Sequence, residues 1–416
     1  MFRLLSLLPL LATLGWSLEN SYGTMGYYRF QTSLQNGKED LYFKAPGAGS
    51  KYRLGNEQDT WIELGLYQDI TFDNDITVHN QVRTVYWGMN EESVDYLQFD
   101  EAYSEISGIF DNSVSFWIGR RYYKRYDSHI ADYWFLNMSG DGFGVNNLDL
   151  GEFTISYSFI FDQLDPESID DEEDLLYHSH DVRLAKTTDR GEATLFLNYI
   201  AGESKTFGNG QHVDSVDGFA IGLLYKDTEL TNDLFGMRGE NISGIFYGEG
   251  AARGAGAYSP YKQDGTIDEM LISGKTPENS MTFRMINYNA FENDTYGIMS
   301  SMVFEHKDDQ DFINIKQDWF SAGVRPYWFM HKHLRGVLEV GYDHVNNKTD
   351  SESHNLLKAT VALEMAMDKG VWRRPALRLY FTQANWSESS KGEVGSGYYA
   401  DKTSGYNFGI QIEEWW

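Results

Sequence analysis

Aromatic residues recur beside charged residues at alternate positions of the chain. Tyr27 lies two residues before Arg29, and Trp61 lies two residues before Glu63. Residues two apart in an extended strand point to the same face, so each ring would share a surface with an ionic group. Rings stack on the apolar C–H faces of sugars, while ionic groups exchange hydrogen bonds with the hydroxyl rims. The spacing therefore indicates carbohydrate binding.

The same pattern appears twice nearer the C-terminus. Trp372 lies two residues before Arg374, and Trp415 falls on the polar face of the closing segment. A row of rings beside a row of ionic groups would bind a sugar chain repeatedly and weakly. A pore needs such binding, because a site that holds its cargo tightly does not conduct. The alternative is that these rings pack beneath a loop folded into the molecule.

A short cluster of Asp127, Ser128, His129 and Asp132 allows a different chemistry. These residue types perform acid–base catalysis, as an outer-membrane phospholipase or protease would need. Catalysis also needs a nucleophile paired with a base, and no nucleophile motif accompanies the cluster. A soluble glycan-binding protein or glycoside hydrolase is a further alternative, since both combine aromatic rings with carboxylates.

The segments that carry these residues alternate strictly between apolar and polar residues. The pattern is clear in residues 153–161, 357–365 and 377–382. Period-2 alternation is typical of strands with one apolar and one polar face. About 20 to 25 residues per strand and connection give about 16 to 20 strands, enough for a water-filled lumen. We therefore predict an all-β protein, a transmembrane antiparallel barrel formed by one domain over residues 18–416, with no sustained helical segment.

Both ends of the chain support an outer-membrane location. Residues 1–17 combine a basic start, an apolar run and small residues, which predicts a secretory signal peptide cleaved after Ser17. Residues 406–416 alternate in polarity and end in an aromatic side chain, as terminal strands of bacterial outer-membrane barrels do. The expected surroundings are therefore the lipid of a Gram-negative outer membrane.

Composition excludes several classes of function. The formal net charge of −28 argues against nucleic acid as a partner, and the absence of cysteine excludes disulfides and thiol chemistry. No segment has the roughly 18 apolar residues of a membrane helix. Residues 162–174 and 251–276 are expected to be external loops. The acidic run at 170–174 could hold a divalent cation or could simply be solvated, and we predict no cofactor and no metal site.

Several blocks of the sequence resemble the maltoporin family. They are Gly26–Arg29, Lys51–Glu57, residues 117–151, Gly323–Pro326, Glu339–Asp343, Trp372–Ala376 and the closing Trp415–Trp416. The resemblance implies an eighteen-stranded, trimeric porin in which one loop folds inward and narrows the pore. It also implies facilitated diffusion of maltose and malto-oligosaccharides along an aromatic slide and an ionic track. A sucrose-type porin or one for another oligosaccharide is the alternative.

The resemblance also assigns roles to individual residues. Those expected in the aromatic slide are Tyr27, Trp61, Trp372 and Trp415. Those expected in the ionic track are Arg29, Arg53, Glu63, Arg125, Asp127 and Asp132. His129 and Trp134 are expected at the constriction, on the inward loop.

The sequence departs from the family pattern at three positions. Trp61 and Trp134 stand where the family has tyrosine, and Asp100 stands where it has a track arginine. A further slide aromatic, supplied by a neighbouring subunit, is expected at Trp87 or Tyr96.

Overall fold

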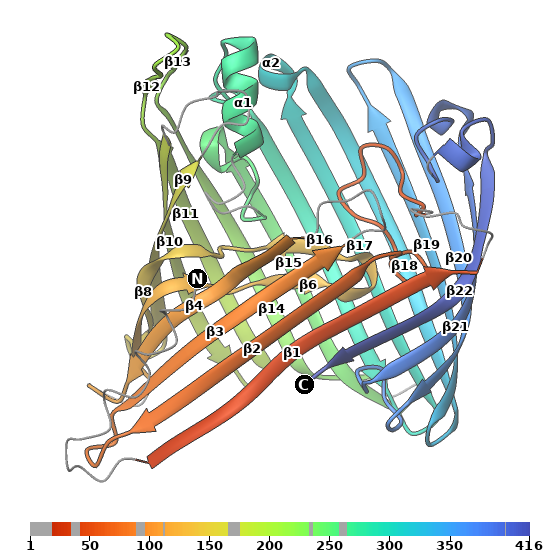
Figure 1. Ribbon diagram of the computed structural model, residues 1–416, viewed down its shortest axis with the longest axis horizontal. Helices are drawn as coiled ribbons and strands as arrows, with labels where there is room; N and C mark the ends of the chain where they lie inside the picture. Colours follow the sequence, from red (N-terminus) through yellow and green to blue (C-terminus); the bar gives the residue numbers. More distant parts are fainter. Residues whose placement is uncertain are drawn as a thin grey trace.

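The protein is a closed barrel of eighteen antiparallel strands (Figure 1). The computed structural model describes residues 19–34, 42–88, 96–110, 113–164, 175–232, 236–257, 264–395 and 397–416. The barrel strands are β1 (Glu19–Ser33), β2 (Thr60–Thr71), β3 (Thr77–Gly88), β4 (Tyr96–Ser107), β5 (Ser115–Arg121), β8 (Gly140–Asp149), β9 (Thr154–Leu164), β10 (Leu175–Thr188), β11 (Gly191–Gly202), β14 (Val216–Asn232), β15 (Met237–Glu249), β16 (Met281–Glu292), β17 (Tyr296–Asp309), β18 (Ile315–His331), β19 (Leu334–Asn347), β20 (Glu352–Ala366), β21 (Ala376–Trp386) and β22 (Ser404–Trp415). The proposed signal peptide at 1–17 and the acidic run at 170–174 lie outside the described residues.

Each strand pairs with its neighbours in the barrel, and β1 closes the sheet against β22. The closing register covers Tyr27–Ser33 of β1, and it joins the first and last strands as a sheet that spans a membrane requires. The expected all-β barrel with eighteen strands is confirmed.

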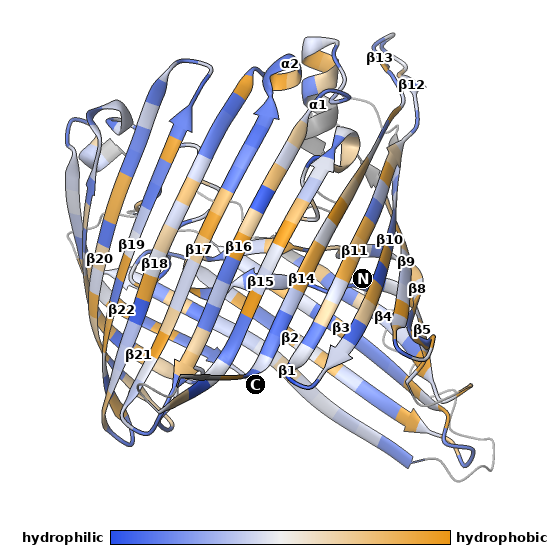
Figure 2. Ribbon diagram, turned by 180° about the vertical axis from the view of Figure 1, so that it is seen from behind, coloured by the Kyte–Doolittle hydropathy of each residue, from blue (hydrophilic) through white to orange (hydrophobic). Residues whose placement is uncertain are grey.

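Strand β21 shows why the alternating segments fold in this way. Leu377, Leu379 and Phe381 are 42%, 56% and 45% exposed on the outer surface, whereas Arg378 and Thr382 are buried inside. Lipid accepts the apolar face, and polar partners inside the barrel satisfy the other. Figure 2 shows the same alternation of hydrophobic and hydrophilic residues along the neighbouring strands.

The two ends of the barrel differ. At one end the connections are short, for example 72–76, 150–153 and 332–333; at the other they are long. The long end carries α1 (Asp264–Ser273), α2 (Gln310–Ile313) and the hairpin of β12 (Lys205–Thr206) and β13 (His212–Val213) (Figure 1). Bacterial barrels have short periplasmic turns and long external loops. The end with the short connections is therefore the periplasmic end, and the opposite end faces outward. Both helices are short, with ten and four residues, and they form in connections between barrel strands, so the fold remains all-β as predicted.

Two long connections fold into the lumen and pack against each other. The first inward loop comprises residues 42–59, and the constriction loop comprises residues 122–139. The constriction loop contains β6 (Tyr126–Ser128), the 3₁₀ turn η1 (His129–Ala131) and β7 (Tyr133–Leu136). Backbone hydrogen bonds from Lys51 to Ala131 (3.2 Å) and from Arg53 to Ile130 (3.1 Å) join the two loops. The predicted inward loop is therefore present, and a second one supports it.

Buried ionic contacts anchor the first inward loop to the barrel wall. The Leu54 N–H donates to Glu339 (3.1 Å), and Lys358 donates to the Leu54 carbonyl (2.7 Å). Lys358 and Arg325 both form ion pairs with Glu339, at 2.7 Å and 2.5 Å. All three ionic side chains are at most 1% exposed. The first inward loop is thus attached to the barrel wall by a buried cluster of charged side chains that pair with one another.

Close packing also requires glycine behind the first inward loop. The buried ring of Tyr52 lies across Gly323 and Gly341 on β18 and β19. A Cβ atom at these positions would lie 2.0 Å and 1.9 Å from the ring. Only glycine leaves room for Tyr52, which explains why both glycines occur in the recognised blocks.

The connection after β15 lies at the end with the long loops, where residues 251–276 were expected. Its first part, the 3₁₀ turn η2 (Gly250–Ala252) and the residues to 257, is largely buried. Asn137 of the constriction loop donates to the Gly256 carbonyl at 2.8 Å, and Arg284 donates to the Gly254 carbonyl at 3.2 Å.

Within the described ranges, no helix is long and apolar enough to cross a membrane.

Candidate functional site

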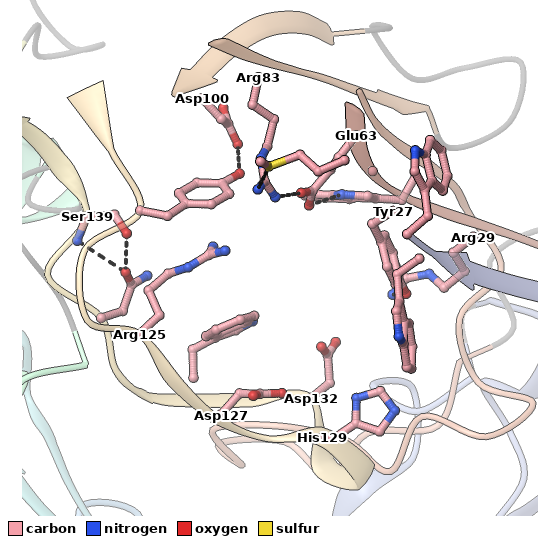
Figure 3. A pocket seen from close by; sticks show the side chains of 18 of the residues that line it. Tyr27, Arg29, Glu63, Arg83, Asp100, Arg125, Asp127, His129, Asp132 and Ser139 are labelled. Carbon is pink, nitrogen blue, oxygen red and sulfur yellow. Dashed lines mark hydrogen bonds and ion pairs between the residues drawn. The ribbon is translucent and has the colours of Figure 1, made fainter. Parts of the chain in front are cut away.

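A cavity of about 960 Å³ lies inside the barrel. Its walls come from β1 to β4, the first inward loop, the constriction loop, the connection at 367–375 and the end of β22. Figure 3 shows Arg125 and Asp127 on one side and Tyr27 and Arg29 on the other, with open space between them. The cavity is lined by all twelve residues singled out from the sequence: Tyr27, Arg29, Arg53, Trp61, Glu63, Arg125, Asp127, His129, Asp132, Trp134, Trp372 and Trp415. Their roles in transport remain predictions.

Three rings form the lower part of the cavity. Tyr27 and Trp415 are register partners on β1 and β22, and their rings stack at 6.4 Å with an interplanar angle of 12°. Trp372 lies 6.4 Å from Trp415, and the His129 ring lies 5.1 Å from Trp372. Strand pairing and one turn thus bring together rings that are far apart in the sequence.

Trp372 reaches the cavity by an unexpected route. Its spacing from Arg374 suggested a strand, but both residues lie in the connection between β20 and β21, which starts only at Ala376. The guanidinium of Arg374 lies 4.1 Å from the Trp415 ring and donates to Glu413 at 3.0 Å. Burial lowers the pKa of Arg374, which the neighbouring Glu413 carboxylate opposes.

Trp61 forms a second aromatic group higher on the wall. It is the register partner of Trp87 on β3, and their rings are 6.4 Å apart. The Trp61 indole N–H donates to Glu63 at 2.9 Å. Trp87 therefore lies beside Trp61 of its own chain, and the side chain of Tyr96, the other residue considered for a neighbour's ring, lies outside the described side chains.

The first inward loop adds Arg53 and Glu57 to the ionic groups beside Tyr27. Arg53 donates to Glu57 (2.9 Å) and to the Tyr27 hydroxyl (2.9 Å), and it pairs with Glu413 at 3.1 Å. Arg29 pairs with Glu57 at 2.8 Å. Burial raises the pKa of Glu57, and the two arginines oppose this effect. The arginines are therefore fixed in place rather than mobile.

Arg83 and Tyr122 also line the cavity, although the sequence did not single them out. Arg83 pairs with Glu63 and with Glu101, each at 2.8 Å. The Tyr122 hydroxyl donates to Asp100, the position of the reversed charge. Arg83 shares a strand face with Trp87, four residues away, so parity along 77–88 was the signal that could have found it.

The constriction loop holds a cation between two rings. The Arg125 guanidinium lies 3.4 Å from the centre of the Tyr122 ring and 4.5 Å from that of Trp134. Such contacts stabilise a cation and hold the planar groups together. Trp134 is 39% exposed, so one face of the stack remains open to the lumen.

The two carboxylates of this loop titrate differently. Burial raises the pKa of Asp127 to about 6, an effect that Arg53 opposes and Asp132 reinforces. For Asp132, burial is outweighed by Lys51 and the neighbouring arginines, so its pKa is lowered. Lys51 donates to Asp132 at 3.2 Å. Asp132 thus stays ionised, and Asp127 changes charge near pH 6.

The sequence matches the family model described as LamB porin over residues 23–416. The chain belongs to the LamB porin family. The resemblance noted from the sequence is therefore confirmed. Family membership and the closed barrel make this protein a porin of the outer membrane, a channel rather than an enzyme.

Solved porins are similar to this LamB-family porin in structure. OpdK of Pseudomonas aeruginosa, solved with vanillate, is 12% identical, with 97% of this chain and 100% of that chain covered and a TM-score of 0.49. OccAB1 of Acinetobacter baumannii is 8% identical, with 96% of each chain covered and a TM-score of 0.49. OmpT of Vibrio cholerae, solved in a trimer form, is 11% identical, with 96% and 99% covered and a TM-score of 0.40. These values carry no conclusion about cargo or assembly.

Local contacts in the LamB-family porin also account for the acid–base cluster. Ser128 is buried and donates to the Ser301 hydroxyl at 2.7 Å, away from His129. The His129 Nδ1 atom lies 3.1 Å from the Arg53 guanidinium, which donates to it. Burial and then Arg53 lower the pKa of His129 well below its usual value. The cluster therefore positions the constriction loop.

No group of three or more metal-ligating side chains occurs among the described residues.

Proposed function

We propose that this porin conducts neutral linear oligosaccharides by facilitated diffusion, with maltose and malto-oligosaccharides as its cargo. The proposal rests mainly on the composition of the cavity wall. Aromatic rings occur there beside polar groups that already have partners, an arrangement that suits repeated, shallow contacts with pyranose rings. Tyr27, Trp415 and Trp372 would contact the sugar faces, and Trp61 would contact them nearer the external side.

Charge balance supports a neutral cargo. Among the described residues that line the cavity, four arginines (Arg29, Arg53, Arg83, Arg125) face four carboxylates (Glu63, Asp100, Asp127, Asp132). A porin for anionic or cationic solutes would gain from an excess of one sign, because rings of like charge set selectivity in pores. The hydroxyl rims of a sugar can instead use donors and acceptors in equal measure. Arg29, Arg53, Glu63, Arg125, Asp127 and Asp132 would form the ionic track.

A porin for a disaccharide such as sucrose is the second candidate. Trp134 favours it, because its indole is partly exposed, lies 4.5 Å from the Arg125 guanidinium and would narrow the passage if it acts at the constriction. A narrower passage would favour short sugars over long linear ones.

We further propose that the mature protein begins after Ser17 and works as a homotrimer in outer-membrane lipid.

Single-channel conductance in a planar bilayer tests the proposal. Maltohexaose should block the ion current saturably, and sucrose should do so weakly. Alanine at Trp372 or Trp415 should weaken the block about twofold to tenfold, the range expected for one aromatic contact. A matched control is Trp328→Ala, which removes an indole 55% exposed on the outer face of β18. Stronger block by sucrose would favour the second candidate, and current unaffected by either sugar would refute both.

A further inference from the structure

A third group of rings faces the lumen, on the periplasmic side of the cavity. Tyr67 on β2, His79 on β3 and Tyr103 on β4 form this group, here named the exit-side ring cluster. Tyr67 and His79 stack at 5.7 Å with an interplanar angle of 27°, and His79 lies 5.8 Å from Tyr103. Three adjacent strands thus present a continuous row of rings.

Strand parity places the exit-side ring cluster on the inner wall. Tyr67 has the same parity as Trp61 and Glu63, which line the cavity, whereas Leu66 is 67% exposed on the outer face. Tyr67 lies six residues beyond Trp61, which is about 20 Å along the strand. It is four residues from the end of β2, at the end of the barrel where the connections are short. The cluster therefore lies between the cavity and the periplasmic mouth.

Met25 connects the cavity to the exit-side ring cluster. It lines the cavity, and its side chain lies over Gly65, where a Cβ atom would be 2.7 Å from it. Tyr67 is the next inward residue on β2, and its ring lies over Gly23, where a Cβ atom would be 2.2 Å away. A chain that leaves the cavity past Met25 therefore meets the Tyr67 ring next.

Hydrogen bonds hold the edges of His79 and Tyr103, and all three rings of the cluster are only partly buried. His79 Nδ1 lies 2.6 Å from Asp69, and His79 Nε2 lies 3.2 Å from the Gln81 side-chain oxygen. The Tyr103 hydroxyl donates to the same Gln81 oxygen at 3.4 Å. Side chains of His79 and Asp69 are 25% and 32% exposed, so the cluster is open to the lumen. Rings that only filled the wall would be buried, as Tyr52 is at 1% exposure.

Ionic groups border the exit-side ring cluster as they border the rings of the cavity. The Arg121 guanidinium lies 4.6 Å from the centre of the Tyr103 ring and pairs with Glu105 at 2.9 Å. Asp69 flanks the other end beside His79. Rings in contact with paired charges are the same chemical arrangement that the cavity offers to a sugar.

We propose that the exit-side ring cluster is a separate carbohydrate subsite that binds pyranose units as they leave the cavity toward the periplasm. The inference rests on the proposed function, since it assigns this subsite to the same neutral oligosaccharide. Stacking on Tyr67 and Tyr103, with hydrogen bonds to Asp69 and Arg121, provides the contacts. A maltohexaose long enough to bridge the cavity and the cluster occupies both, and maltose occupies one at a time.

Sided addition of sugar tests the subsite. In the double variant Tyr67→Ala with Tyr103→Ala, maltohexaose added on the periplasmic side should block the current with an association rate about threefold to tenfold lower. The rate from the external side should change less than about twofold, because that route begins at Trp61. The variant Tyr67→Phe with Tyr103→Phe keeps both rings and should restore the rate. Tyr225→Ala, on the outer face near the same end, is the matched control.

The outcomes separate the inference from the proposed function. Wild-type protein blocked by maltohexaose, with an unchanged periplasmic association rate in the double alanine variant, overturns the subsite alone. Equal losses from both sides, or a similar loss in Tyr225→Ala, also overturn it, since they indicate a general change in the barrel. No block of the wild-type protein by maltohexaose overturns the proposed function and the subsite with it. Unchanged open-channel conductance confirms that the variant barrels are intact.

Discussion

Lowering the pH from 7 to 5 is expected to change the ion selectivity of the pore through Asp127. Burial, reinforced by Asp132, raises the pKa of this carboxyl to about 6. Asp127 is then about nine-tenths ionised at pH 7 and about one-tenth ionised at pH 5. Because an acid with a raised pKa loses its charge as pH falls through that pKa, the cavity wall moves from balance toward one excess positive charge. Anions should therefore pass more easily at pH 5.

The size of the effect follows from the position of Asp127 in the cavity. A unit charge about 7 Å from a passing ion changes its energy by about 0.6 kcal/mol in water. That corresponds to about a threefold change for each sign of ion, in opposite directions. The cation-to-anion permeability ratio should thus fall about threefold to tenfold between pH 7 and pH 5, with its midpoint near pH 6.

Reversal potentials in a salt gradient measure this ratio. Asp127→Asn should give at pH 7 the selectivity that the wild-type protein reaches at pH 5, and it should show no further step near pH 6. Asp214→Asn removes an acid that is 74% exposed outside the barrel, so it serves as the matched control and should keep the step. A step that persists in Asp127→Asn would assign the titration to another group and refute the reasoning.

Three further predictions follow from the contacts inside the barrel. Arg83→Gln removes one of the four cavity arginines and the partner of Glu63 and Glu101, so reversal potentials at pH 7 should show higher cation selectivity; unchanged selectivity would contradict a role for Arg83 in charge balance. Glu339→Gln leaves Lys358 and Arg325 buried without their partner and should lower the free energy of unfolding by about 3 to 5 kcal/mol in urea titrations. The control Glu388→Gln, at a carboxylate 78% exposed, should change it by less than about 1 kcal/mol. Gly323→Ala forces a methyl group against Tyr52 and should displace the first inward loop, which higher or noisier single-channel conductance would reveal and unaltered conductance would disprove.

The strands were predictable because a membrane-spanning wall must alternate. Leu377 and Leu379 face lipid while Arg378 faces the interior, and this requirement repeats along every barrel strand. The same rule predicts Tyr27, Trp61 and Trp415 on the lumen side, where all three line the cavity. Family resemblance, rather than alternation, supplied the strand number and the inward loop.

The alternation of apolar and polar residues does not predict the contacts that loops make. The stack of Tyr122, Arg125 and Trp134 depends on how the constriction loop turns, which alternation does not specify. Trp372 lines the cavity as predicted, but it belongs to a connection and not to a strand. Its strand parity with Arg374 therefore does not explain its position. The helix α1 formed where no neighbouring strand constrains the chain.

The position of Arg83 bears on the charge of Asp100, which stands where the family has an arginine. Asp100 would leave the cavity with more carboxylates than arginines if Arg83 were absent, but Arg83 on the adjacent strand restores four of each. The net charge of the whole chain is −28, so balance in the cavity does not simply follow from composition. Arg83 also binds Glu63 and Glu101 from the same wall, which keeps its charge within the cavity. Arg83 on β3 thus offsets the charge of Asp100 on the neighbouring β4, and a wall balanced in this way suits the uncharged cargo proposed above.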